Sequence, residues 1–150
     1  MTAISLSSLA GQVSPPVAEI GDLLDRFVED APSAHAALLT DAHGLPLLWT
    51  GELPEETADH FAAIMLGLDS LANSAAQCFA GDRCERLFLE LDTEFVFVER
   101  IGHRALLGVV ADKKADLGAV GYEVTLLGAR FSSRIDEAVV AELAGRVGTP

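Results

Sequence analysis

Basic residues are scarce in this chain of 150 residues. It has 10 lysines and arginines against 23 aspartates and glutamates, which gives a formal net charge of −13. Binding to the phosphates of a nucleic acid, or to an anionic membrane surface, needs clustered lysine and arginine side chains. The composition therefore argues against both kinds of partner, and it favours attraction to basic patches on other proteins.

Long apolar runs and cysteines are also scarce. No stretch reaches the roughly 18–20 apolar residues of a membrane-spanning helix, and the start, MTAISLSSLAGQVSPP, lacks the basic residues of a secretory signal peptide. The two cysteines, Cys78 and Cys84, match no zinc or thioredoxin spacing. Two thiols without a disulfide framework fit a reducing cytoplasm, although a local disulfide between them stays an open alternative. We expect a cytoplasmic protein without direct membrane insertion, which partners could recruit to a membrane.

Motifs for catalysis and metal binding are missing as well. The chain has neither the Gly-x-Ser-x-Gly turn of serine hydrolases nor the Walker lysine motif of P-loop nucleotidases. Its histidines have no second ligand at metal-binding spacing; they are His35, His43, His60 and His103. Cys84 has Arg83 and Arg86 nearby, and positive charge favours a reactive thiolate, but no base accompanies it. We therefore predict no catalytic residues, no cofactor and no metal.

The pattern of apolar residues predicts one α/β (α+β) domain in the order α-β-β-α-β-β-β-α. We expect helices over about 17–29, 54–80 and from 117 onward, and strands over 35–40, 45–50, 86–91, 94–100 and 105–111. Short links favour antiparallel pairing into a five-stranded sheet, and helices on both faces would cover the apolar strands. Residues 1–16 are interpreted as a flexible leader, 17–147 as the domain and 148–150 as a frayed tail.

Three segments predict finer details of this fold. The strand 105–111 is apolar throughout and is expected at the centre of the sheet, whereas Pro46 cannot donate to a strand ladder and favours an edge. Asp116 is well placed to cap the last helix. The side of this helix that we expect to be buried carries Leu117, Val120, Val124, Leu127 and Phe131, and the helix could continue past 132–133 through Ile135, Val139 and Leu143.

The middle helix, 54–80, carries a pattern on two different faces. Apolar residues at spacings of three and four are expected to face the core: Phe61, Ile64, Met65, Leu68, Leu71, Ala72, Ala75 and Phe79. On another face Ala63, Gly67, Ser70 and Ser74 form a small-residue seam that would let a second backbone come close. Gly67 costs about 1 kcal/mol against alanine inside a helix, so an offsetting contact is expected. A solvated face that happens to carry small residues is the alternative, and spacing alone does not decide.

An ordered set of segments resembles the roadblock/dynein light chain family, especially its actinobacterial members. The segments are FVEDAP, AALLTDAHGLPLL, FAAIMLGLDSLANSAA, LFLELDTEFVFV, ALLGVVA and DLGAVGYEVTLL. The likeness extends from about Leu23 to Phe131, and the leader to Pro16 lies outside it. The set is fairly specific, although no single segment is as sharp as a metal-binding signature.

The resemblance implies a profilin-like sandwich that forms homodimers. In such dimers the middle helix, here 57–78, pairs with its mate, and the following strand, here 86–92, meets its mate edge to edge. Bacterial members of the family often act with a small Ras-like GTPase, and actinobacterial relatives belong to systems that also contain a sensor-kinase-like protein. The family supplies no catalytic residue in a fixed motif, so none is carried over, and the fold alone does not establish a function.

Three hypotheses for function follow. The first is a non-enzymatic homodimeric regulator or scaffold of a small Ras-like GTPase in a signalling complex. Its predicted dimer or partner interface consists of Ala63, Leu66, Gly67, Ser70, Ser74, Arg86, Phe88, Glu90 and Asp92. The second is a small-ligand sensor domain with an internal cavity, which the continuous apolar strands permit. The third, an enzyme that acts through Cys84, has the least support.

Overall fold

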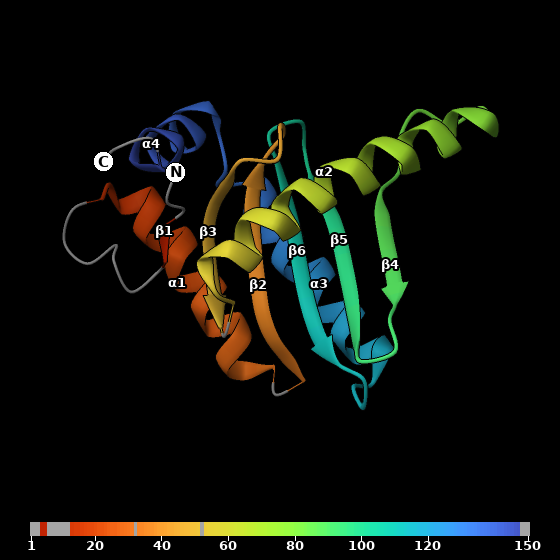
Figure 1. The fold of residues 1–150 in the computed structure, drawn as a ribbon. Coiled ribbons are helices and arrows are strands. Elements are labelled where there is room, and N and C mark those ends of the chain that lie inside the picture. The colour runs from red at the N-terminus through yellow and green to blue at the C-terminus, as the bar shows by residue number, and fades with distance from the viewer. Residues whose placement is uncertain (1–3, 6–12, 32, 52, 148–150) are drawn as a thin grey trace.

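The computed structural model of the protein describes residues 4–5, 13–31, 33–51 and 53–147. Within them, six strands form one sheet in the order β1-β3-β2-β6-β5-β4, and four helices surround it (Figure 1). The strands are β1 (Ile4–Ser5), β2 (Ala34–Asp41), β3 (Pro46–Gly51), β4 (Arg86–Glu90), β5 (Glu94–Ile101) and β6 (Ala105–Asp112). The helices are α1 (Pro15–Asp30), α2 (Glu55–Cys78), α3 (Leu117–Ser132) and α4 (Glu137–Val147). Strands β2 to β6 pair antiparallel, as predicted.

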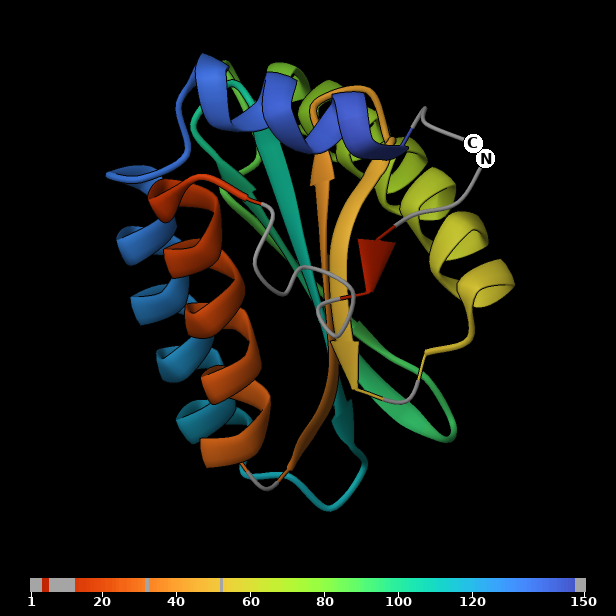
Figure 2. The same cartoon turned by 90° about the vertical axis from the view of Figure 1, so that its left-hand side faces the viewer.

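Helices cover both faces of the sheet (Figure 2). One face packs against α1 and α3, and α4 closes the same core by packing on β3 and α1. The other face packs against α2, the one described helix on that side, over a smaller cluster that includes Leu38, Trp49 and Met65. The sheet is therefore the middle layer of a sandwich, and its α2 side is the less covered one.

The centre of the sheet is β6, as its apolar sequence predicts, because it lies between β2 and β5. Gly108 on this strand lies directly beneath side chains of α2. A Cβ atom there would lie 2.6 Å from Met65 Sδ and 3.1 Å from Phe61 Cε2. The absence of a side chain at this one position lets the helix lie directly on the strand.

The last helical region differs from the prediction, because it consists of two helices and not one. The chain turns after α3, and the Asp136 side chain accepts a hydrogen bond from the Val139 amide at 2.9 Å, which caps the start of α4. Ile135, Val139 and Leu143 are buried as predicted, but α4 carries the last two across β3. The prediction that Leu117 is buried is wrong: its side chain is exposed at the first position of α3. Asp116 does cap α3, accepting from the Ala119 amide at 3.2 Å.

Part of the segment interpreted as a leader forms the edge strand β1 beside β3. Within the segment interpreted as a leader, Ile4 and Ser5 pair in parallel with Leu48 and Trp49 of β3. Strand β3, which carries Pro46, was expected at the edge of the sheet; it lies one strand in from the edge, because β1 pairs with it at Leu48 and Trp49. The rest of the expected leader before residue 13, and the expected tail at 148–150, fall outside the described residues.

Candidate partner-binding site

The helix α2 crosses the sheet obliquely from β3 to β4, and its last turns continue beyond β4 (Figure 1). Its fully buried side chains belong to the first part of the helix, and they end at Asp69. The predicted apolar face is correct for Met65 but wrong for several residues, because Ile64, Leu71, Ala75 and Phe79 are exposed. Leu71 and Ala75 lie in the C-terminal half of α2 and Phe79 directly follows it, where the helix extends beyond β4 (Figure 1), whereas Ile64 lies in the first half with its side chain turned to solvent.

The small-residue seam lies on the exposed face of α2. Ala63, Gly67, Ser70 and Ser74 are all exposed, and a Cβ atom on Gly67 would have no heavy atom within 4 Å. No contact within the described residues therefore offsets the helix-propensity cost of Gly67.

Leu66 lies apart from the seam. Its side chain contacts the β2–β3 turn, where its Cβ lies 3.0 Å from the position that a Cβ on Gly44 would occupy. The structure therefore does not bring this predicted interface residue together with the others.

Two large apolar side chains border the seam on the same face, and sequence reasoning had assigned them to the core. Ile64 is 44% exposed and Leu71 is 72% exposed. Phe79, directly after the helix, is 87% exposed. An exposed group of this kind, rimmed by polar residues, is typical of a protein–protein contact. The signal that could have found it is the length of the helix, since 24 residues reach further than the sheet requires.

The strand β4 is the free edge of the sheet next to this helix. Among the described residues it pairs with β5 and no other strand, and its burial alternates, with Leu87 and Leu89 half-buried towards α2. On the α3 side Phe88 is 42% exposed and contacts the rings of Phe95 and Phe97 at centroid distances of 5.5 and 5.3 Å. The outer edge leaves backbone donors and acceptors available to another strand.

Charged residues of β4 and of the following turn have partners within the chain or face solvent. Arg86 pairs with Glu99 at 3.1 Å, and Glu90 pairs with Lys113 at 2.8 Å. Asp92 is exposed in the turn after the strand. The structure thus places the remaining predicted interface residues on or directly after one edge, beside the C-terminal half of α2.

Glu99 is the titratable group with the clearest perturbation near this edge. Burial raises the pKa of its carboxyl group above the usual 4.5, against the opposing effect of the Arg86 hydrogen bond and charge. Its Oε2 atom has no hydrogen-bond partner among the described residues. The same carboxylate lies against the backbone of α3, since a Cβ on Gly128 would come within 2.9 Å of Glu99 Cδ.

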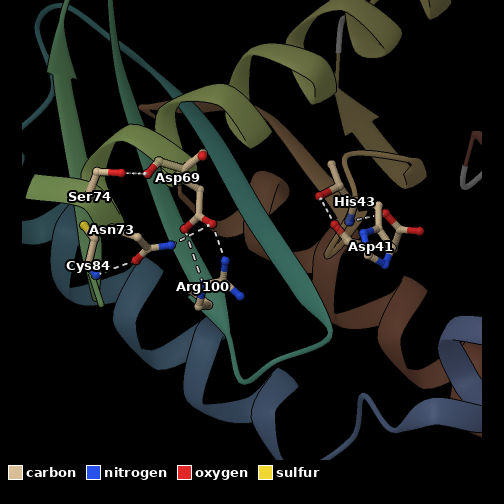
Figure 3. A network of polar contacts seen from close by, with 9 residues as sticks. Asp41, His43, Asp69, Asn73, Ser74, Cys84 and Arg100 are labelled. Carbon is tan, nitrogen blue, oxygen red and sulfur yellow. Dashed lines mark hydrogen bonds and ion pairs between the residues drawn. The ribbon is translucent and has the colours of Figure 1, made fainter. Parts of the chain in front are cut away.

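A polar network joins α2, β5 and the loop before β4 (Figure 3). The Asp69 carboxylate forms an ion pair with the Arg100 guanidinium, whose Nε donates at 3.3 Å. Asn73 Nδ2 donates to Asp69 at 3.2 Å, and Asn73 Oδ1 accepts from the Cys84 amide at 2.7 Å. Cys84 Sγ lies 3.2 Å from the Arg86 carbonyl oxygen, and both cysteines are free thiols. Sequence reasoning missed this network because its members come from three separate segments.

The described residues form several clefts on the surface. One of about 740 Å³ lies beneath the end of α2, and it is lined by Asn73, Gln77, Asp82, Arg83, Glu85, Arg100 and His103. In the described part of the chain, no three His, Cys, Asp or Glu side chains are grouped so that they could hold a metal ion. Nor does any helix in that part have the length and apolar character needed to cross a membrane.

The arrangement of one antiparallel sheet between α1/α3 and α2 defines a profilin-like α+β sandwich. Profilin of Schizosaccharomyces pombe shares this fold, with a TM-score of 0.55 over 73% of this chain and 94% of that chain, at 10% identity. MglB of Myxococcus xanthus aligns with a TM-score of 0.71 over 77% of this chain and 93% of that chain, at 19% identity.

Comparison of the amino-acid sequence with family profiles narrows this fold class to one family. The profile of the Roadblock/LC7 domain matches residues 20–111. A Roadblock/LC7 domain of Streptomyces avermitilis is 33% identical, with a TM-score of 0.69 over 74% of this chain and 92% of that chain. The chain belongs to the Roadblock/LC7 family, as its ordered segments predicted. A comparison with curated proteins finds no significant match.

Proposed function

We propose that this protein is a homodimeric regulator or scaffold of a small Ras-like GTPase. The observation that carries the proposal is the outer face of α2, where the small-residue seam and the exposed Leu71 lie beside the free edge of β4. These two elements are the ones through which the resemblance to the family implies pairing. Membership of the Roadblock/LC7 family supports the proposal.

In the proposed dimer a two-fold axis relates the same patch on both copies. Gly67 and Ser70 allow the two α2 helices to approach closely, and Ile64 and Leu71 supply apolar area around them. The two β4 strands then join edge to edge, which satisfies backbone groups that one copy leaves open.

The GTPase is proposed to bind on or near the paired helices. This chain supplies no catalytic group in the proposal; it acts by positioning residues of the GTPase itself. The formal net charge of −13 favours a partner with a basic contact surface. A sensor-kinase-like protein is a further proposed member of the complex.

The dimer is tested by light scattering of Gly67→Leu. The wild-type chain is expected at twice 15.8 kDa, and the variant is expected to shift towards the monomer because leucine fills the seam. Gly145→Leu on α4 is the matched control, since a Cβ atom there also has no heavy atom within 4 Å. A variant that remains as dimeric as the wild type would rule out the seam as the contact.

The GTPase role is tested with purified small Ras-like GTPases from the same organism. Their rates of GTP hydrolysis and their binding are measured with wild-type protein and with Gly67→Leu. A changed rate supports a regulator, and a complex with an unchanged rate supports a scaffold. The absence of both, with the wild type dimeric, would contradict the GTPase role while leaving the dimer intact.

The alternative of a small-ligand sensor requires an enclosed cavity. The clefts described along the chain open to solvent, and the cleft beneath α2 is lined only by polar and charged side chains. No specific observation favours this alternative.

A further inference from the structure

The attachment of α2 to its own sheet changes character at Asp69. Before this residue, the helix is held by fully buried apolar side chains, which are Ala58, Ala62 and Met65. Between 70 and 78 no side chain is buried. Hydrogen bonds that the Asp69 carboxylate accepts from Arg100, and that the Asn73 amide oxygen accepts from Cys84, hold this half of the helix instead.

These hydrogen bonds tie the helix to both strands at the free edge. Asp69 holds Arg100, which lies near the end of β5. Asn73, one turn further along the helix, accepts from the amide of Cys84, two residues before β4 begins. The same two side chains thus join the helix to the edge strand and to the strand beside it.

Along α2, each residue of the polar network directly precedes a residue of the seam. Asp69 is 7% exposed and directly precedes the exposed Ser70, and the half-buried Asn73 directly precedes the exposed Ser74. Because successive side chains on a helix are about 100° apart, the rotation that points Asp69 and Asn73 at the sheet determines where the seam points. A rotation of the helix about its axis would break these hydrogen bonds, and the same rotation would point the seam in another direction.

A buried ion pair of this kind adds little stability, because the cost of desolvating two charges offsets most of their attraction. The Asp69 and Arg100 side chains are only 8% and 18% exposed. What hydrogen-bonded charges do supply is direction, since each bond is satisfied in one geometry only. Such networks fix one arrangement among several of similar energy.

We infer that Asp69, Arg100 and Asn73 are positioning residues for partner binding: they hold the C-terminal half of α2 at one rotation above β4, so that seam and strand edge form a single contact surface. The inference rests on the proposed homodimer. A surface that is ordered before binding loses less conformational freedom when a second copy docks. The network therefore acts on dimer affinity far more than on folding.

The test compares the double variant Asp69→Leu/Arg100→Met with the wild type. It removes both charges, so that no unpaired charge stays buried. The expected result is an unchanged fold by circular dichroism, a dimer dissociation constant raised about tenfold in analytical ultracentrifugation, and severalfold faster amide hydrogen exchange at 70–78 than in the wild type. Exchange in the first half of α2 stays unchanged.

The matched control is Glu19→Gln/Arg134→Met, which removes the exposed ion pair of 2.6 Å on the α1/α3 side. It is expected to leave dimer affinity and exchange at 70–78 unchanged. Should the double variant fail to fold, Asn73→Ala leaves the ion pair in place and removes the hydrogen bonds of Asn73 to Asp69 and to Cys84, with the same two readouts expected to move in the same direction.

The outcomes separate the two proposals. A wild-type dimer together with wild-type affinity in the folded variants would overturn the inference and keep the proposed function. If the wild-type protein is a monomer, the proposed homodimer is overturned. Amide hydrogen exchange at 70–78 in the double variant then tests the network by itself, and exchange unchanged from the wild type would overturn the inference that the network positions the helix.

Discussion

Replacing Gly67 by alanine and replacing Gly108 by alanine should change the free energy of unfolding in opposite directions. Gly67 lies on α2 and faces open space, whereas Gly108 lies on β6 beneath the helix and faces Met65 and Phe61. Replacing each by alanine adds one methyl group, so the chemistry of the change is identical. The neighbours of the added methyl group differ between the two variants, and so does the local backbone, which is helical at Gly67 and extended at Gly108.

The expected magnitudes follow from those surroundings. At Gly67 only helix propensity changes, and Gly67→Ala should raise the free energy of unfolding of the monomer by about 1 kcal/mol, which is a gain of about 2–4 °C in Tm. At Gly108 the new Cβ would lie 2.6 Å from Met65 Sδ. Overpacking of this kind costs about 1–3 kcal/mol. The flexible end of Met65 can shift, so we expect a loss near the lower limit.

The assay is urea unfolding at protein concentrations low enough for the monomer, repeated at high concentration. At low concentration Gly67→Ala should be more stable than wild type and Gly108→Ala less stable. At high concentration the gain from Gly67→Ala should shrink, because the methyl group keeps the paired helices apart. A loss of monomer stability in Gly67→Ala would refute the reasoning, since it would mean that this face of α2 packs within its own chain.

Two further predictions concern single side chains. Glu99 has a raised pKa in the folded state, so the wild-type free energy of unfolding should fall as the pH rises from about 4.5 through that raised value. Glu99→Gln should remove this contribution. If urea unfolding gives parallel pH profiles for the two proteins, the prediction is contradicted. Asp116→Ala removes the α3 cap and should lower stability by about 1 kcal/mol, measured by thermal unfolding, whereas Asp116→Asn keeps an acceptor and should lose much less.

The order and type of the strands were predictable because each depends on a short segment. The apolar run of β6 indicates its place in the sheet without any long-range information. The division between α3 and α4 was not predicted, although its signal is local. Asp136 stands where a capping residue starts a new helix, but the apolar spacing continues across it and favours one long helix.

The candidate site was harder to predict because periodicity says which residues share a helix face, not what lies under that face. Leu71 and Met65 follow the same apolar pattern, yet Met65 is buried against the sheet and Leu71 is exposed. Asp69 and Arg100 are 31 residues apart, and a charged residue in a helix is normally interpreted as solvated. Their pairing depends on how α2 crosses the sheet, which is a property of the tertiary structure.

The two edges of the sheet differ in a way that bears on how many copies can assemble. Beside β3, the two residues of β1 already occupy part of the edge by pairing with Leu48 and Trp49. Beside β4 the described chain places no strand. Strand pairing across a two-fold axis uses the β4 edge of both copies at once and leaves only the partly occupied β3 edges outside. Growth into a filament would need two open edges on every copy. In the proposed assembly β1 occupies part of the second edge, and this limits the continuous sheet to two chains.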